Sequence, residues 1–173
     1  MKCLMEVTVM REILFRGFTP DENGRETITV NGKQIRGEWV QGSYWELRET
    51  TYCFQSDYDR HPDNTKHYIV FDRMTDWGLP NRHLQADVIP ETVGQFTGLT
   101  DQNGKKIFEG DILRFSYTGR NHGVEGTEAV VFKNGKFGVE WGWHRELVAL
   151  DGFANTTIEV IGNIHDNPEL LEG

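Results

Sequence analysis

Four asparagine–glycine pairs indicate turns along this chain. They occur at Asn23-Gly24, Asn31-Gly32, Asn103-Gly104 and Asn134-Gly135. Such a pair suits the type I′ turn of a β-hairpin, because both central residues of that turn need a positive φ. The segments between the turns are rich in β-branched and aromatic residues, and no long segment repeats apolar residues at helical spacing. The sequence therefore predicts an all-β protein.

The expected strands fall into two halves. In the first half we expect strands at residues 12–18, within 26–49 and at 66–74, and in the second half at 92–99, 105–117, within 127–144 and at 157–164. The strands of the second half suffice for a small β-barrel. Residues 75–87 combine Gly, Pro and Asn with no periodicity, so we expect a connection there, with Trp77 packed against the sheet. Asn167 and Pro168 predict one helical turn near the end of the chain.

These patterns predict the domain organisation. A chain of 173 residues can bury a core of its own and fits one domain or two small lobes. Residues 10–87 are expected to form an N-terminal β region, and residues 88–173 the barrel with its terminal helical turn, either as two units or as one continuous domain. Residues 1–9 are expected to form a poorly ordered extension.

The charge pattern makes nucleic acid an unexpected partner. The chain has 18 basic and 27 acidic residues and a net charge of −9, so its average field repels polyanions. The basic residues are scattered among acids instead of forming a stripe. No segment has the length and apolarity of a membrane span, and residues 1–9 do not form a secretory leader. Cys3 and Cys53 match no metal or redox spacing, and we expect reduced thiols in a cytoplasmic protein without membrane contact.

Aromatic residues are the candidates for an interaction surface. The four tryptophans that could anchor a partner are Trp39, Trp45, Trp141 and Trp143. If residues 137–143 form one strand, Trp141 and Trp143 share a face. An aromatic row of this kind serves as core packing, as a lid over the barrel end or as a ligand platform.

The acidic loop around residue 60 resembles a calcium loop only superficially. Asp57, Asp59 and Asp63 alternate as oxygen ligands do in an EF-hand. Counted from Asp57, however, the sixth and twelfth positions hold Pro62 and Tyr68, where an EF-hand needs a glycine and a bidentate acid. A solvated loop is the better interpretation.

No catalytic constellation is evident. His61 and His67 could form a weak metal site with Asp57 or Asp59, but no spacing requires them to converge. Cys53 lies in an apolar segment without an evident base, and the glycine-rich stretch at residues 118–126 precedes a strand and lacks the P-loop lysine. We therefore expect no catalytic residue, no resident cofactor and no metal.

Four blocks of sequence carry a family resemblance: MREILFRGF (10–18), GEWVQGSY (37–44), VGQFTGLTDQNGKKIFEGDIL (93–113) and IEVIGNIHDNPELLEG (158–173). Together they resemble the YopX family. The resemblance implies a mostly β protein with an SH3-like barrel in the C-terminal half, encoded by a phage or prophage in a bacterial host cell, with no established biochemical activity. It supplies no catalytic residues. The chain departs from the family pattern in residues 1–9 and around residues 44–60.

The third block has a structural interpretation. Its glycines Gly94, Gly98, Gly104 and Gly110 punctuate strands and turns. Asp111 is expected to accept backbone N–H bonds in the turn after Gly110, which is a folding role.

Three functions remain open. The first is a non-catalytic β-barrel module for binding or assembly, whose partner is a second copy or a phage or host protein. The second is a nucleic-acid-associated accessory protein, which would require certain basic residues to gather beside exposed aromatics: Arg36, Lys105, Lys106 and Arg114. The third is a metal-dependent enzyme that uses His61 and His67.

Overall fold

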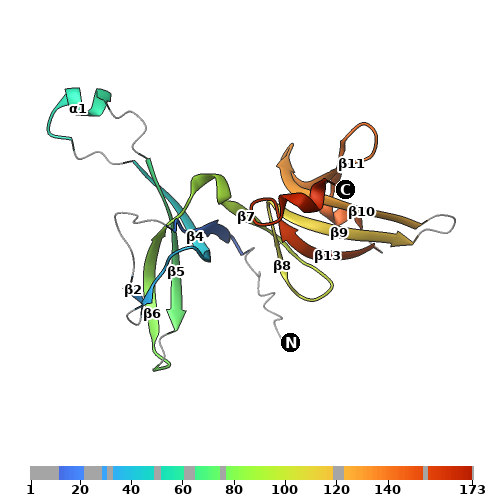
Figure 1. Cartoon of the computed structure of the whole chain (residues 1–173), viewed down its shortest axis with the longest axis horizontal. Helices are drawn as coiled ribbons and strands as arrows, with labels where there is room; N and C mark the ends of the chain where they lie inside the picture. The colour runs from blue at the N-terminus through green and yellow to red at the C-terminus, as the bar shows by residue number, and fades with distance from the viewer. Residues whose placement is uncertain are drawn as a thin grey trace, which may run out of the picture.

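Two large antiparallel sheets make up the fold. The structure is a computed structural model, and it describes residues 12–21, 29–30, 33–48, 52–60, 65–74, 77–118, 123–153 and 156–172. One sheet has six strands and the other five, and a further two-stranded sheet pairs β2 (Thr29–Val30) with β3 (Lys33–Gln34). Figure 1 shows the five-stranded sheet on one side of the molecule and most of the six-stranded sheet on the other. The predicted all-β class is confirmed.

The six-stranded sheet combines segments from both halves of the chain. Its order is β6 (Pro80–Asp87), β5 (Thr65–Met74), β4 (Trp39–Arg48), β1 (Phe15–Phe18), β7 (Gly94–Thr100) and β8 (Lys106–Phe108). β1 is central but short, and it pairs with β4 only from Phe15↔Gly42 to Phe18↔Trp39. The predicted boundary at residues 87/88 stays a prediction, although β7 and β8 follow it in sequence and pair into this first sheet.

The five-stranded sheet lies wholly in the second half. Its order is β12 (Glu146–Ala149), β11 (Lys136–Trp141), β10 (Gly123–Lys133), β9 (Asp111–Thr118) and β13 (Thr156–Asn163). β12 and β13 are its two edges, so the described strands form open sheets and no closed barrel. An SH3-like arrangement of these strands stays a prediction.

In the described part of the chain, helical structure is confined to short turns. They are α1 (Gln55–Arg60), η1 (Pro90–Thr92), η2 (Leu150–Phe153) and η3 (Pro168–Leu171). The turn predicted at Pro168 is η3, but the Asn167 side chain makes no capping hydrogen bond there. Among the described residues, no helix has both the length and the apolar character needed to cross a membrane.

The Asn-Gly turns can be compared with their predicted chemistry at two places. At the β10–β11 hairpin, Asn134 and Gly135 have φ values of 55° and 78°, as a type I′ turn requires. At Asn103-Gly104 only Gly104 is left-handed, and this turn is closed instead by the Asp101 side chain. The pairs at Asn23 and Asn31 include residues outside the described part of the chain.

Each large sheet has its own core. The core of the five-stranded sheet contains Ile107, Leu113, Phe115, Val130, Val139, Leu150 and Val160, and that of the six-stranded sheet contains Ile35, Val40, Ile69, Ala86 and Val88. Ile107 is notable because it belongs to β8 of one sheet and packs in the core of the other. The two sheets are therefore joined by shared apolar packing.

Two expectations for residues 75–87 were wrong. The segment contains β6, which pairs with β5 from Tyr68↔Asp87 to Met74↔Pro80 and buries Ala86 in the core. Pro80 is tolerated because it is the first residue of an edge strand. Trp77 is almost fully exposed at the β5–β6 turn and does not pack against the sheet.

Candidate functional site

The four candidate tryptophans divide into packed and exposed pairs. Trp39 is half-buried between the two sheets, and Trp141 packs on Phe115 with ring centroids 5.0 Å apart. Trp45 is 59% exposed on β4, and Trp143 is 96% exposed in the β11–β12 turn. They therefore do not form one surface.

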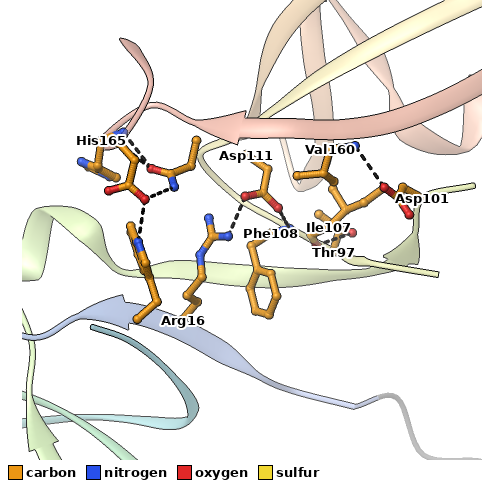
Figure 2. A network of polar contacts seen from close by, with 11 residues as sticks. Arg16, Thr97, Asp101, Ile107, Phe108, Asp111, Val160 and His165 are labelled. Carbon is orange, nitrogen blue, oxygen red and sulfur yellow. Dashed lines mark hydrogen bonds and ion pairs between the residues drawn. The ribbon is translucent and has the colours of Figure 1, made fainter. Parts of the chain in front are cut away.

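A buried ion pair joins the two sheets. Arg16 Nη1 in β1 donates to Asp111 Oδ1 in β9 over 2.6 Å, and the side chains are only 10% and 1% exposed. The second carboxylate oxygen of Asp111 accepts the Phe108 N–H over 2.8 Å. Figure 2 shows Arg16 reaching across to Asp111. Burial raises the pKa of Asp111, and Arg16 and the Phe108 N–H oppose that rise.

Aromatic rings and a second carboxylate complete this joint. The Arg16 guanidinium lies 4.7 Å from the Trp39 ring centroid and 4.9 Å from that of Phe108. Trp39 Nε1 donates to Asp166 over 2.8 Å, and Asn163 Nδ2 donates to the same oxygen over 2.7 Å. The family-like blocks at residues 10–18, 37–44, 93–113 and 158–173 thus meet at one place, where their polar residues hold the sheets together.

Asp111 accepts a backbone N–H bond, but not from the turn after Gly110, and its ion-pair partner was missed. The Asp111 carboxylate accepts the Phe108 N–H at the β8–β9 corner, so the donor precedes Gly110. Arg16 lies 95 residues away in sequence. The available signal was a single cation inside the apolar run LFRGF, which indicates a buried charge that needs a partner.

Asp101 performs a similar structural task at the edge of the second sheet. Its Oδ1 accepts the N–H groups of Asn103 and Lys105, and its Oδ2 accepts that of Val160 in β13 over 3.1 Å. Burial raises the pKa of Asp101, but these three N–H bonds outweigh it, and the pKa lies below its ordinary value. The carboxylate therefore closes the 101–105 turn and fastens it to β13.

The Asp101→Asn variant is expected to lose about 1–3 kcal/mol of unfolding free energy at pH 7, because an amide NH₂ would replace one of the accepting oxygens. The lowered pKa means that the unfolded chain takes up the proton first. The stabilisation by Asp101 is thus present above about pH 4 and is lost as the pH falls through the folded-state pKa. Urea unfolding at pH 7 and pH 3 measures this, and the gap between variant and wild type should narrow at pH 3.

The matched control is Asp151→Asn, at an exposed position in η2. This variant should change the unfolding free energy by about 0.5 kcal/mol or less. An Asp101→Asn deficit that stays the same at both pH values would contradict the assigned role.

The structure describes three of the residues proposed as metal ligands, and each contacts another side chain. His67 Nδ1 lies 2.5 Å from the Tyr44 hydroxyl, Asp57 faces Arg60 at 3.7 Å, and Asp59 accepts from Gln55. His61 and Asp63 lie outside the described residues. Within the described ranges, His, Cys, Asp and Glu side chains form no group of three or more that could hold a metal ion.

Two of the basic residues of the nucleic-acid hypothesis form ion pairs with acids. Lys106 Nζ is 2.7 Å from Glu12 and Arg114 is 3.9 Å from Glu159. Lys105 donates its backbone N–H to the Asp101 carboxylate. The charges of Lys106 and Arg114 are thus countered locally, so these two cations do not favour a polyanion. Arg36 is half-buried, and its Nε has no hydrogen-bond partner among the described residues.

An arm extends from the six-stranded sheet. It consists of residues 43–48 of β4, the segment 52–60 with α1, and residues 65–68 of β5. β1 pairs with β4 only as far as Gly42, and β6 pairs with β5 only from Tyr68 onward, so beyond the Trp45↔Tyr68 pair the arm is a two-stranded ribbon. Figure 1 shows α1 at its end, away from the five-stranded sheet.

The arm exposes apolar side chains. Trp45 and Leu47 alternate along β4 and therefore share a face, and both are exposed. Phe54 and Tyr58 are exposed near α1. Tyr44 points to the opposite face, where its ring lies 5.5 Å from Phe15, and burial together with Glu46 raises its pKa. Of these residues, sequence analysis found only Trp45.

Comparisons with known proteins identify the family. The chain matches the family described as YopX protein over residues 31–172. None of the curated proteins matches. The crystal structure of protein EF1440 from Enterococcus faecalis is similar at 21% sequence identity with a TM-score of 0.45, covering 92% of this chain and 98% of that chain. Because the family match covers most of the sequence, this chain belongs to the YopX family.

Proposed function

We propose that this protein is a non-catalytic assembly module that associates with a second copy of itself through its arm. The observation that carries the proposal is the exposed pair Trp45 and Leu47 on the part of β4 that extends beyond its pairing with β1. Large apolar side chains gathered on one exposed face are typical of protein–protein contact sites, and tryptophan is a frequent anchor. On this proposal the five-stranded sheet is an SH3-like scaffold.

The β4 edge favours a second copy as the partner. Beyond Gly42, no described strand pairs with the β4 edge that faces β1. An open strand edge pairs readily with another strand. Two copies of β4 can meet antiparallel about a twofold axis, and opposed residues then share a face. This arrangement would join the Trp45–Leu47 pairs of both copies into one apolar surface.

The net charge predicts how such a dimer responds to salt. Each copy carries a charge of −9, so two copies repel each other at long range. Salt screens this repulsion, with a Debye length of about 8 Å at physiological ionic strength. Association should therefore strengthen as salt is added.

We further propose that the protein works in the cytoplasm of a bacterial cell that carries a phage or prophage.

Size-exclusion chromatography with light scattering tests the proposal. The wild-type protein is expected to show a concentration-dependent dimer, and Trp45→Asp should weaken dimerisation at least about ten-fold, as loss of an interface anchor does. Both Trp45 and the control residue Trp143 are exposed, so neither substitution should unfold the chain.

The control variant is Trp143→Asp, the same change at a turn in the other sheet. It should leave the dimer unchanged. A wild-type protein that stays monomeric at every concentration and salt level would contradict the proposal. So would a dimer that is disrupted by Trp143→Asp but not by Trp45→Asp.

A further inference from the structure

A cleft opens in the five-stranded sheet where β11 leaves β10. The two strands pair only from Val130↔Val139 to Lys133↔Lys136. Residues 126–129 of β10 pair with β9 on one side, and no described strand pairs with them on the other. The cleft has a volume of about 570 Å³ and is bounded by this part of β10, the end of β11, Arg145 and η3.

The apolar walls of the cleft are fixed by packing. The Trp141 ring lies edge-on to Phe115 and covers Gly126, where an added Cβ would come within 2.4 Å of a Trp141 ring carbon. Leu170 and Leu171 of η3 line the cleft as well. A ligand would therefore meet a preformed apolar surface, which lowers the entropy lost on binding.

Two carboxylates give the cleft its polar character. The side chains of Glu128 and Glu140 are 18% and 25% exposed, whereas that of Arg145, which lies between them, is 61% exposed. Arg145 Nη1 is 3.1 Å from Glu128, and Arg145 Nη2 is 3.9 Å from Glu140. Glu140 also pairs with Lys133 Nζ at 2.6 Å, so Arg145 is the nearest described cation only for Glu128. The acids are thus built into the wall, and Arg145 reaches in from an exposed turn.

We propose that this cleft binds an extended peptide segment of a partner protein, in which an arginine or lysine lies next to apolar residues. In the free protein, Arg145 occupies the position that this cation takes. The unpaired edge at residues 126–129 accepts a peptide backbone by strand addition. Glu128 and Glu140 recognise the incoming cation, and arginine suits two carboxylates because its planar guanidinium donates in two directions. Trp141 and the two leucines take the flanking apolar side chains.

When the cation of the ligand displaces Arg145, the free energy of the ion pairs in the cleft should change little. Exposed ion pairs contribute little to stability, so Arg145 can leave without disturbing the fold. The cation of the ligand would replace the one that departs. Affinity would then come from the apolar flanks and the strand pairing, and selectivity for a basic peptide would come from the two carboxylates.

The experiment is an NMR titration of the full-length protein with the blocked peptide Ala-Leu-Arg-Leu-Ala and with the same peptide carrying glutamine in place of arginine. The arginine peptide should shift the resonances of residues 126–129 and the Trp141 indole. The glutamine peptide should bind about ten-fold more weakly or worse, as expected when a charged partner is lost. The Glu128→Gln/Glu140→Gln double variant should show the same loss.

Arg145→Ala supplies the most discriminating result. If Arg145 is a competitor, this variant should bind the arginine peptide about two- to five-fold more tightly. If the variant binds more weakly, Arg145 itself contacts the ligand and the proposal is overturned. Absence of localised shifts with the arginine peptide at a concentration of several millimolar, where a Kd of about 1 mM is detectable, would overturn it as well.

The cleft proposal does not depend on the arm. The titration is repeated on Trp45→Asp, which lies in the other sheet. Peptide binding should be retained there even if self-association is lost. Loss of cleft binding with an intact dimer would overturn only the cleft proposal, and the reverse result would overturn only the proposed assembly through the arm.

Discussion

The Asp111→Ala variant is expected to lose about 3–5 kcal/mol of unfolding free energy, as happens when one partner of a buried ion pair is removed. Without Asp111, the Arg16 guanidinium would remain buried between the rings of Trp39 and Phe108 with no described carboxylate bound to it. The Phe108 N–H would lose its acceptor too. Urea unfolding at pH 7, followed by tryptophan fluorescence, measures the loss.

Two further variants separate the buried charge from the packing around it. The Arg16→Met/Asp111→Ala double variant should be less destabilised than the sum of the single variants, because no unpaired charge is left. Glu159→Ala removes the acid of the exposed Arg114 pair and should change the unfolding free energy by about 1 kcal/mol or less. If Asp111→Ala has no larger effect than Glu159→Ala, the joint does not stabilise the fold as assigned.

Phe108→Ala is the second substitution with a large expected effect, again about 3–5 kcal/mol of unfolding free energy. Phe108 is 1% exposed and lies at the end of β8, where the chain passes from one large sheet to the other. Its ring packs on Phe96 with centroids 5.6 Å apart and against the Arg16 guanidinium. Truncation would leave a cavity at the joint, and denaturant unfolding reports its effect.

Phe132→Ala is the matched control for this truncation. Phe132 lies on β10 and is 52% exposed, with its ring 4.9 Å from that of Phe137. Loss of the ring there should lower the unfolding free energy by about 1 kcal/mol or less. Equal losses at the two positions would mean that the surroundings of Phe108 collapse to fill the cavity, and the joint would then not depend on its ring.

Local signals in the sequence predicted the parts of the fold that local chemistry determines. The strand expected at residues 66–74 is β5, and Asn134-Gly135 adopts the left-handed conformations that its turn type needs. β6 was missed because its residues, PNRHLQAD, carry no strand pattern of their own. Pairing with β5 supplies that strand, and such pairing depends on tertiary structure.

The candidate site was predictable only in part, for the same reason. Tryptophan identity marked Trp45 and Trp143 as possible anchors, but nothing local separated them from Trp39 and Trp141, which are consumed by packing. Whether each ring is covered depends on residues from distant segments, such as Phe115 at Trp141 and Arg16 at Trp39. Sequence patterning around a single residue does not encode that information.

The course of the chain through residues 94–111 limits where the gene can recombine without disrupting the fold. β7 and β8 belong to the sheet of the first half, and only two residues separate the end of β8 from the start of β9 in the other sheet. A genetic exchange at the midpoint of the gene would therefore separate the first sheet from two of its strands, and Arg16 from Asp111. Where genes of this kind recombine, the two sheets should therefore be inherited together. The tip of the arm, which packs in neither core, is free to diverge.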